Sequence, residues 1–183
     1  MVDSLGVLPR VPARPDNGRS EPAAEERKAG AHPSLEPELE ARRRAALAQI
    51  RSFGDPALRT KASEVVSFDA ALAAEAERMG RLMANAIGVG LAATQLGVMH
   101  RLLVYRAGPD APLVAVVNPH LEWASDEQEV AEEGCLSLPS VVLDVERPVH
   151  VRVSARDERG EAMLVEASGL EARVIQHEIV KIV

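Results

Sequence analysis

The stretch GVGLAATQLG, residues 88–97, decides how the rest of the chain is interpreted. Gly88, Gly90 and Ala93 match the loose G-x-G-x-x-A pattern of dinucleotide-binding loops, which requires a strand before it and a helix after it. The opposite order is predicted here, because an amphipathic helix precedes the stretch and a strand soon follows it. The glycines equally suit a tight turn where the backbone passes close to another group. Gln95 adds a side-chain amide that could donate to a developing oxyanion.

Apolar periodicity around this stretch predicts an α+β fold. One helix is predicted over residues 34–51 with Ser34 as N-cap, and a second over residues 67–85 with Ser67 as N-cap. The second helix places its apolar side chains on one face: Leu72, Met79, Leu82, Met83 and Ala86. Apolar runs then predict strands at 100–106, 112–118, 120–124 and 149–155, a turn at Arg159-Gly160 into another strand, and a helix from Ser168.

Length and composition favour a single globular domain. The chain has 183 residues, 46% of them hydrophobic, which is enough for an ordinary core. The net charge of −7 argues against nucleic acid or an anionic membrane as the main partner. Residues 1–34 are rich in Pro, Arg, Ala, Gly and Glu without an apolar period, which predicts a disordered extension before a domain at 35–183. No apolar segment suits a secretory signal or a membrane span, so we expect a cytoplasmic protein.

The single cysteine of the chain, Cys135, lies in EEGCLSLPS, residues 132–140. Pro139 cannot donate a hydrogen bond within a central strand, which places this stretch at an edge or a bend. A cysteine that follows Gly134 at such a bend can present its sulfur and leave neighbouring N–H groups free. A small, buried core cysteine fits equally well, so the stretch alone leaves both roles open.

The last eight residues, QHEIVKIV (176–183), contain half of an H-E-x-x-H motif. In the complete motif, two histidines four residues apart share one helix face and bind one metal ion. His177 and Glu178 are present here, whereas Lys181 stands where the second histidine would be. A histidine among apolar neighbours on a helix is usually structural, so this stretch alone also leaves two roles open.

Taken together and in this order, the three stretches resemble the peptide deformylase motifs G-x-G-x-A-A-x-Q, E-G-C-L-S and H-E-x-D-H. Residues 88–95 match the first motif and residues 133–137 the second, both completely, while residues 177–178 match the first half of the third. The resemblance extends from about residue 50 to residue 179. It implies one peptide-deformylase-like domain with antiparallel sheets around the helix that carries the metal motif, and it displaces the dinucleotide-binding interpretation.

The resemblance implies a metal-dependent hydrolase that removes the formyl group from the N-terminal formyl-methionine of newly synthesised proteins. Cys135 and His177 would be ligands of Fe(II), with Zn, Ni or Co as substitutes. Glu178 would act as general base, while Gln95 and the backbone N–H of Leu136 would hold the oxyanion. A metal with three protein ligands keeps a fourth position for water and lowers the pKa of that water to about 7.

The same resemblance implies how the substrate binds. Gly90 would approach the substrate backbone closely and Gly134 would also contact it, while Val89 with Val174 or Ile175 would line the methionine pocket. The expected partners are N-formyl-methionyl nascent peptides close to the ribosome, without direct binding of nucleic acid or membrane.

One further pair resembles the family's supporting residues. Glu133 with Arg147 is similar to an ion pair that supports the metal ligands, although a solvated surface pair would have the same sequence.

The third motif departs from the family at Val180 and Lys181, where Asp and His are expected. A protonated ammonium has no lone pair to give and repels a divalent cation, so we expect weakened metal binding. The alternative function is therefore a catalytically impaired protein that at most binds formyl-methionyl peptides. Lys181 is expected to be exposed near the chain end, and the family's natural ending is expected to be truncated or replaced within the motif helix. Three other histidines are candidate substitutes that nothing in the sequence directs to the site: His100, His120 and His150.

Overall fold

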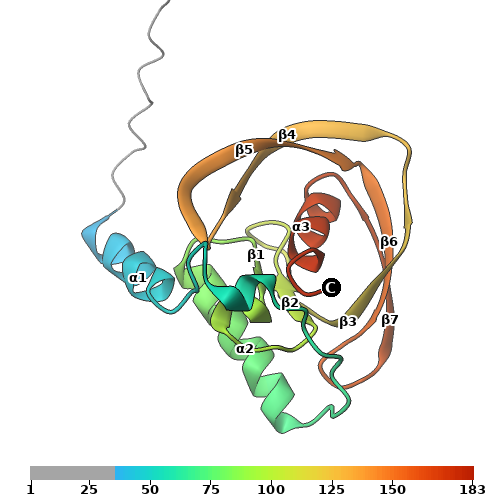
Figure 1. Ribbon diagram of the computed structural model, residues 1–183, viewed down its shortest axis with the longest axis horizontal. Helices are drawn as coiled ribbons and strands as arrows, with labels where there is room; N and C mark the ends of the chain where they lie inside the picture. The colour runs from blue at the N-terminus through green and yellow to red at the C-terminus, as the bar shows by residue number, and fades with distance from the viewer. Residues whose placement is uncertain (1–35) are drawn as a thin grey trace, which may run out of the picture. The chain divides into compact units, whose positions relative to one another are not determined.

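The computed structural model describes residues 36–183 (Figure 1). Ser34 and the predicted disordered extension, residues 1–34, lie outside them. Helix α1 spans Pro37–Leu47, which is shorter than the predicted 34–51. Proline suits the first turn of a helix because its missing N–H would be unpaired there.

Helix α2 spans Ala70–Asn85 and buries the predicted apolar face. Its N-cap is Asp69, not Ser67 as predicted: the Asp69 carboxylate accepts hydrogen bonds from the N–H groups of Ala71 at 2.9 Å and Leu72 at 3.1 Å. Ser67 instead donates to Asp69 at 3.2 Å. Asp69 is the N-cap because its carboxylate, two residues nearer the helix than Ser67, can accept hydrogen bonds from two free N–H groups of the first turn.

Five antiparallel strands form the main sheet in the order β1-β2-β3-β6-β7. Their bounds are Gly90–Ala92, Leu102–Tyr105, Val114–Ala124, His150–Arg156 and Ala162–Ser168. The two strands predicted at 112–118 and 120–124 are one strand, β3, with register shifts between Val117 and His120 and again between Leu121 and Trp123. Asn118 makes the first irregularity, with a φ of 50° and a side chain that bonds both N–H and C=O of Val65 at 2.8 Å. Asparagine tolerates this left-handed conformation better than most residues.

Strands β4 (Gln128–Cys135) and β5 (Leu138–Pro148) form a separate two-stranded ribbon, which arches over the lower part of the fold in Figure 1. Neither strand was predicted, because their sequences are rich in charged residues and most of their side chains are exposed. The two-residue connection at 136–137 makes the bend expected from Pro139, which lies near the start of β5.

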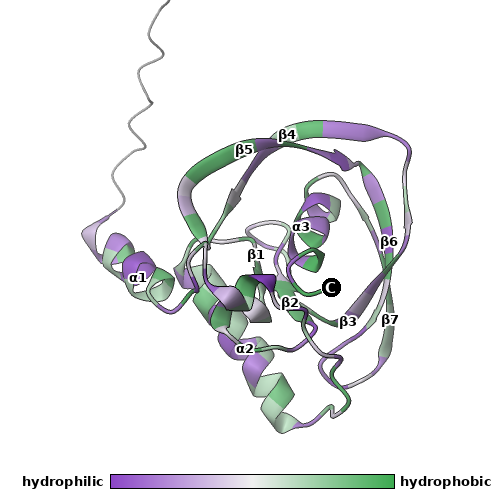
Figure 2. Ribbon diagram, in the orientation of Figure 1, coloured by the Kyte–Doolittle hydropathy of each residue, from purple (hydrophilic) through white to green (hydrophobic). Residues whose placement is uncertain are grey.

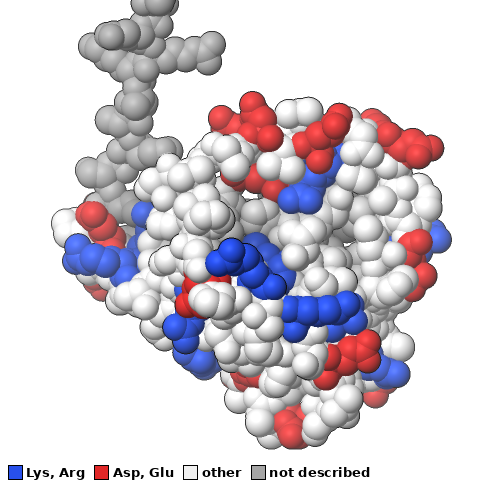
Figure 3. All heavy atoms as spheres, viewed as in Figure 1, with Lys and Arg blue, Asp and Glu red and all other residues white. Residues whose placement is uncertain are grey.

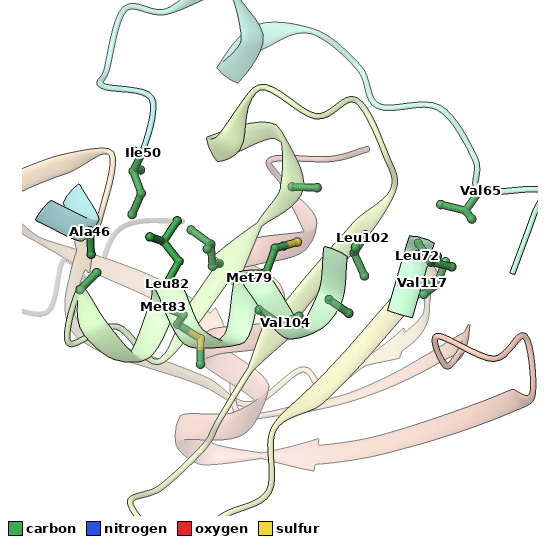
Figure 4. Close-up of a cluster of buried hydrophobic side chains, with 14 residues drawn as sticks. Ala46, Ile50, Val65, Leu72, Met79, Leu82, Met83, Leu102, Val104 and Val117 are labelled. Carbon is green, nitrogen blue, oxygen red and sulfur yellow. The ribbon is translucent and has the colours of Figure 1, made fainter. Parts of the chain in front are cut away.

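The sheet is packed between two helices, α2 and α3 (Gly169–Ile179). Successive residues of β2 face opposite sides, so Leu102 and Val104 join α2 in one core cluster, while Leu103 and Tyr105 join α3 in the other. Figure 4 shows the first cluster, and Figure 2 shows polar and apolar residues side by side along both helices. The predicted α+β class is confirmed. No helix within residues 36–183 is long and apolar enough to cross a membrane.

Candidate active site

Three elements bring the three motifs together: the 3₁₀-helix η2 (Ala93–Leu96), the end of β4 and the helix α3. Gln95 of η2 is fully buried, and its Nε2 lies 3.0 Å from Ser137 Oγ and 3.9 Å from Cys135 Sγ. Its Oε1 accepts from the Ala92 N–H at 2.9 Å. The amide therefore presents its NH₂ group toward the cysteine, as an oxyanion donor would have to do.

Cys135 on the ribbon and His177 on α3 meet directly. Although burial alone raises the pKa of the Cys135 thiol, its hydrogen bond with His177 and the charge of Lys181 outweigh burial and lower that pKa below its usual value. The same bond to Cys135 raises the pKa of His177. A lowered thiol pKa and a nearby imidazole are typical of a metal-binding or reactive pair.

A buried carboxylate orients the histidine. Glu133 accepts from His177 Nδ1 at 2.8 Å and is held by Arg147 through two bonds of 2.6 and 2.8 Å. Burial alone raises the pKa of Glu133, but the bonds from Arg147 and His177 outweigh it and lower that pKa to about 2. The Glu133 side chain is only 8% exposed, so the interpretation as a solvated surface pair is wrong.

Sequence reasoning missed one member of this network, Arg173. Its guanidinium donates to Glu133 Oε1 at 3.0 Å, and the residue is buried. Arg173 lies four residues before His177, so the two share one face of α3. That spacing from the candidate ligand His177 is the signal that could have identified it.

Lys181 lies inside the site. Its Nζ is 2.8 Å from each carboxylate oxygen of Glu178 and 3.3 Å from Gln95 Oε1. The expectation of an exposed lysine is wrong: its side chain is 15% exposed, the Thr94 hydroxyl donates to its backbone carbonyl at 3.0 Å, and Ile182 beyond it is fully buried. The ammonium therefore pairs with Glu178 in the place where the motif would put a ligand.

The predicted substrate-binding residues lie on both sides of the site. A Cβ built on Gly90 would lie 2.8 Å from Glu178 Oε1 and 2.9 Å from Val174 Cγ1, so only glycine fits there. Val89, one residue earlier, is 48% exposed, so this side of the site is accessible to solvent. Gly134 lies on the ribbon, at the register shift before Cys135.

The remaining two predicted residues are more deeply packed. Ile175 is fully buried in the α3 core cluster and has no exposed surface, which leaves Val174 as the nearer of the two proposed pocket residues. Leu136 follows Cys135 and packs its side chain against the backbone at Gly88, where an added Cβ would lie 2.7 Å from Leu136 Cδ1.

The three substitute histidines do not join the site. Each pairs with a carboxylate elsewhere: His100 with Glu75 at 3.0 Å, His120 with Glu122 at 3.4 Å and His150 with Glu127 at 3.9 Å. No group of three His, Cys, Asp or Glu side chains within residues 36–183 could hold a metal ion. The donors present therefore do not fit a three-ligand metal centre, although Cys135 and His177 would supply two ligands of one.

Figure 3 shows where charges gather around the site. Acidic side chains follow the upper rim, where the β4–β5 ribbon lies in Figure 1, and Lys and Arg side chains surround the hollow beneath it. The acidic rim would repel the phosphates of nucleic acid from that part of the surface.

The family model for polypeptide deformylase matches residues 47–181, a range that contains all three motifs. This chain belongs to the polypeptide deformylase family. The peptide deformylase of Thermotoga neapolitana is 47% identical over 130 residues, which cover 71% of this chain and 78% of that protein. The crystal structure of the peptide deformylase from Thermotoga maritima is similar, with a TM-score of 0.69 at 45% identity over 71% of this chain and 87% of that one.

A second deformylase structure carries a ligand. It is that of the Synechococcus elongatus enzyme in complex with actinonin, which has a TM-score of 0.68 at 41% identity and covers 71% of this chain and 72% of that one. The predicted peptide-deformylase-like fold is thereby confirmed. The dinucleotide-binding pattern has no support in the structure, because residues 88–97 form a short strand and a 3₁₀-helix instead of opening a phosphate-binding helix.

Proposed function

We propose that this chain is a deformylase that hydrolyses the N-formyl group from formyl-methionine at the start of newly synthesised proteins. One observation carries the proposal: Gln95, Cys135, His177 and Glu178, from three separate motifs, converge on one site in a member of the deformylase family.

Glu178 and Gln95 have complementary roles in this reaction. The Glu178 carboxylate takes a proton from the water that attacks the formyl carbon and passes it to the leaving amine as the C–N bond breaks. The products are formate and a free N-terminus. Gln95 Nε2 and the Leu136 N–H donate to the oxygen on which negative charge develops. Lys181 donates to both oxygens of Glu178, and each oxygen keeps a further lone pair with which it can accept the proton.

The substrate backbone runs between the two glycines. Gly90 on β1 and Gly134 on the ribbon allow close approach of an extended peptide, and the methionine side chain packs against Val89 and Val174. Ile175 supports Val174 from the core without contacting the substrate.

Metal binding at this site is expected to be weak, because two of the three motif ligands are present. Cys135 and His177 are proposed as ligands of Fe(II), with Zn, Ni or Co as substitutes, and Glu133 fixes the His177 ring through its Nδ1. With Lys181 in the third position, we expect the affinity for these metals to be lower than in a three-ligand site. A bound metal would supply a water of lowered pKa.

The setting follows from the substrate. Formyl-methionyl nascent chains are proposed as the partners, close to the ribosome and in the cytoplasm. The catalytic domain is proposed to cover residues 35–183, and residues 1–34 to be an extension outside it.

The test is turnover of formyl-Met-Ala by the chain purified anaerobically with Fe(II) or Ni(II). The control is the double variant Val180→Asp, Lys181→His, which completes the third motif. Turnover of both proteins within about tenfold supports the proposal for the chain as it stands. Turnover by the double variant alone would show that Lys181 leaves the chain catalytically impaired, and no turnover by either protein would overturn the proposed function.

A further inference from the structure

The site is divided between two elements that no β-ladder connects. Cys135 lies on the β4–β5 ribbon, whereas His177 lies on α3, and the ribbon shares no backbone pairing with the five-stranded sheet among residues 36–183. Backbone bonds reach the loops beside the ribbon, as from the Phe53 N–H to the Ser137 carbonyl at 2.7 Å, so side-chain contacts have to fix the ribbon strands themselves against α3. We propose that Arg173 is a positioning residue that holds the ribbon against α3 and so fixes the position of Cys135 relative to His177. The catalytic importance of that position rests on the proposed function.

Arg173 bonds both strands of the ribbon at once. Its NH1 donates to the Val145 carbonyl of β5 at 2.8 Å, and its NH2 donates to the Glu129 carbonyl of β4 at 2.7 Å. A third bond, from NH1 to Glu133 Oε1 at 3.0 Å, reaches the carboxylate of the site. The planar guanidinium suits this task because its donors point in fixed directions and can serve several acceptors together.

The spacing of the residues links this anchor to the site. Arg173 and His177 are four residues apart on one helix face, and Glu133 and Cys135, at the end of β4, both bond His177. Glu133 receives Arg173 on Oε1 and His177 on Oε2. A shift of the ribbon relative to Arg173 therefore moves both Cys135 and the carboxylate that orients His177.

Little apolar packing supports the ribbon otherwise. Its larger apolar side chains are mostly exposed, including Val130 at 60%, Val142 at 57% and Leu143 at 60%. Two other side chains of α3 also bond the ribbon: His177 Nδ1 bonds Glu133 Oε2 on β4 at 2.8 Å, and Gln176 Nε2 donates to the Pro148 carbonyl at the far end of β5 at 3.0 Å. Unlike these two side chains, Arg173 bonds the backbone of both ribbon strands.

The test compares Arg173→Met, which keeps the length of the side chain but has no donors, with Arg173→Lys, which can reach only part of the acceptors. Arg152→Met is the matched control, because Arg152 forms an exposed pair with Glu166 on the main sheet at 2.6 Å. Amide hydrogen exchange is measured over the ribbon and over α2, and the His177 Nδ1–H resonance is followed by NMR.

We expect Arg173→Met to raise exchange in the ribbon by about 10- to 100-fold, the range for losing a hydrogen bond to a charged donor, while α2 stays unchanged. The His177 Nδ1–H resonance is expected to broaden or disappear. Arg173→Lys should fall between wild type and Arg173→Met, and Arg152→Met should match wild type. Unchanged ribbon exchange with an unchanged His177 resonance would overturn the inference, as would an equal rise in exchange over α2, which indicates general destabilisation.

These measurements need no turnover, so they separate this inference from the proposed function. Where turnover is measurable, a positioning role predicts that Arg173→Met lowers kcat more than it raises KM. If the wild-type chain and its metal-site double variant both lack activity, the proposed function fails while the exchange and NMR data still decide the role of Arg173.

Discussion

Replacing Gly90 with alanine tests whether β1 and α3 pack as closely as the site requires. The added Cβ would lie 2.8 Å from Glu178 Oε1, 2.9 Å from Glu178 Cγ and 2.9 Å from Val174 Cγ1. Optimal carbon contacts are about 3.5–4.0 Å, so roughly 0.6–1.1 Å of movement is needed between the strand and the helix.

Neither partner can yield easily. Glu178 is 3% exposed and bonded to Lys181 through both oxygens, while Val174 is 5% exposed within the core. Extra methyl groups in a packed interior typically cost about 1–3 kcal/mol. Because about 1 kcal/mol shifts the melting temperature of a domain of this size by about 2–4 °C, we expect a decrease of about 2–12 °C.

The assay is urea unfolding followed by far-UV circular dichroism, with the thermal midpoint as a second measurement. Gly134→Ala is the matched control from the opposite side of the site, because its Cβ would meet nothing closer than the Val141 carbonyl at 3.9 Å. It should change the free energy of unfolding by less than about 0.5 kcal/mol. Equal stabilities for the two variants would refute the close packing of α3 against β1.

Three further predictions concern the metal, the cap of α2 and the core. The affinity for cobalt(II), measured by thiolate absorption, should be higher in Lys181→Met than in wild type because the ammonium is removed. It should be at least about tenfold higher in Lys181→His, which adds a ligand. A Lys181→Met variant that binds cobalt(II) no more tightly than wild type would contradict obstruction by the ammonium. The bond from the Leu72 N–H is the main cause of the lowered pKa of Asp69. The ionised Asp69 therefore stabilises the folded state fully above the unfolded carboxyl pKa of about 3.9, and this stabilisation is lost as the pH falls through the lower pKa of the folded state. Urea midpoints of wild type and Asp69→Asn should therefore converge in acid, and a constant difference down to pH 2 would argue against the cap. Met79→Ala should lose about 2–5 kcal/mol by calorimetry because the side chain is fully buried, whereas Phe53→Ala, at a 76% exposed position, should change little.

The sequence predicted the elements whose apolar residues follow a clear period. The buried face of α2 and the strand β6 were found because one side of each faces the core. The ribbon was missed because its strands are charged and largely exposed, so the alternation that identifies a half-buried strand is absent. The cap of α2 was misplaced by two residues since Ser67 and Asp69 both suit that role.

Within the candidate site, motifs identified the residues but not all of their contacts. Gln95, Cys135 and His177 come together as expected. The burial of Lys181 was not foreseen, because an isolated lysine near a chain end gives no sign of the buried carboxylate that will pair with it. Arg173 was missed for a related reason: its acceptors are mostly backbone carbonyls, whose positions depend on strands that the sequence did not predict.

The bonds made by Gln95 have a consequence for the polarity of the pocket. A side-chain amide has nearly the same shape when turned by 180°, yet the turn exchanges an acceptor for a donor. Here the Ala92 N–H occupies the oxygen end from a backbone that cannot turn with it, so reversal would set two donors against each other. The NH₂ group is thereby directed at Cys135 by the main chain itself, and under the proposed function a substrate carbonyl oxygen would meet a donor whose direction is set by the folded backbone.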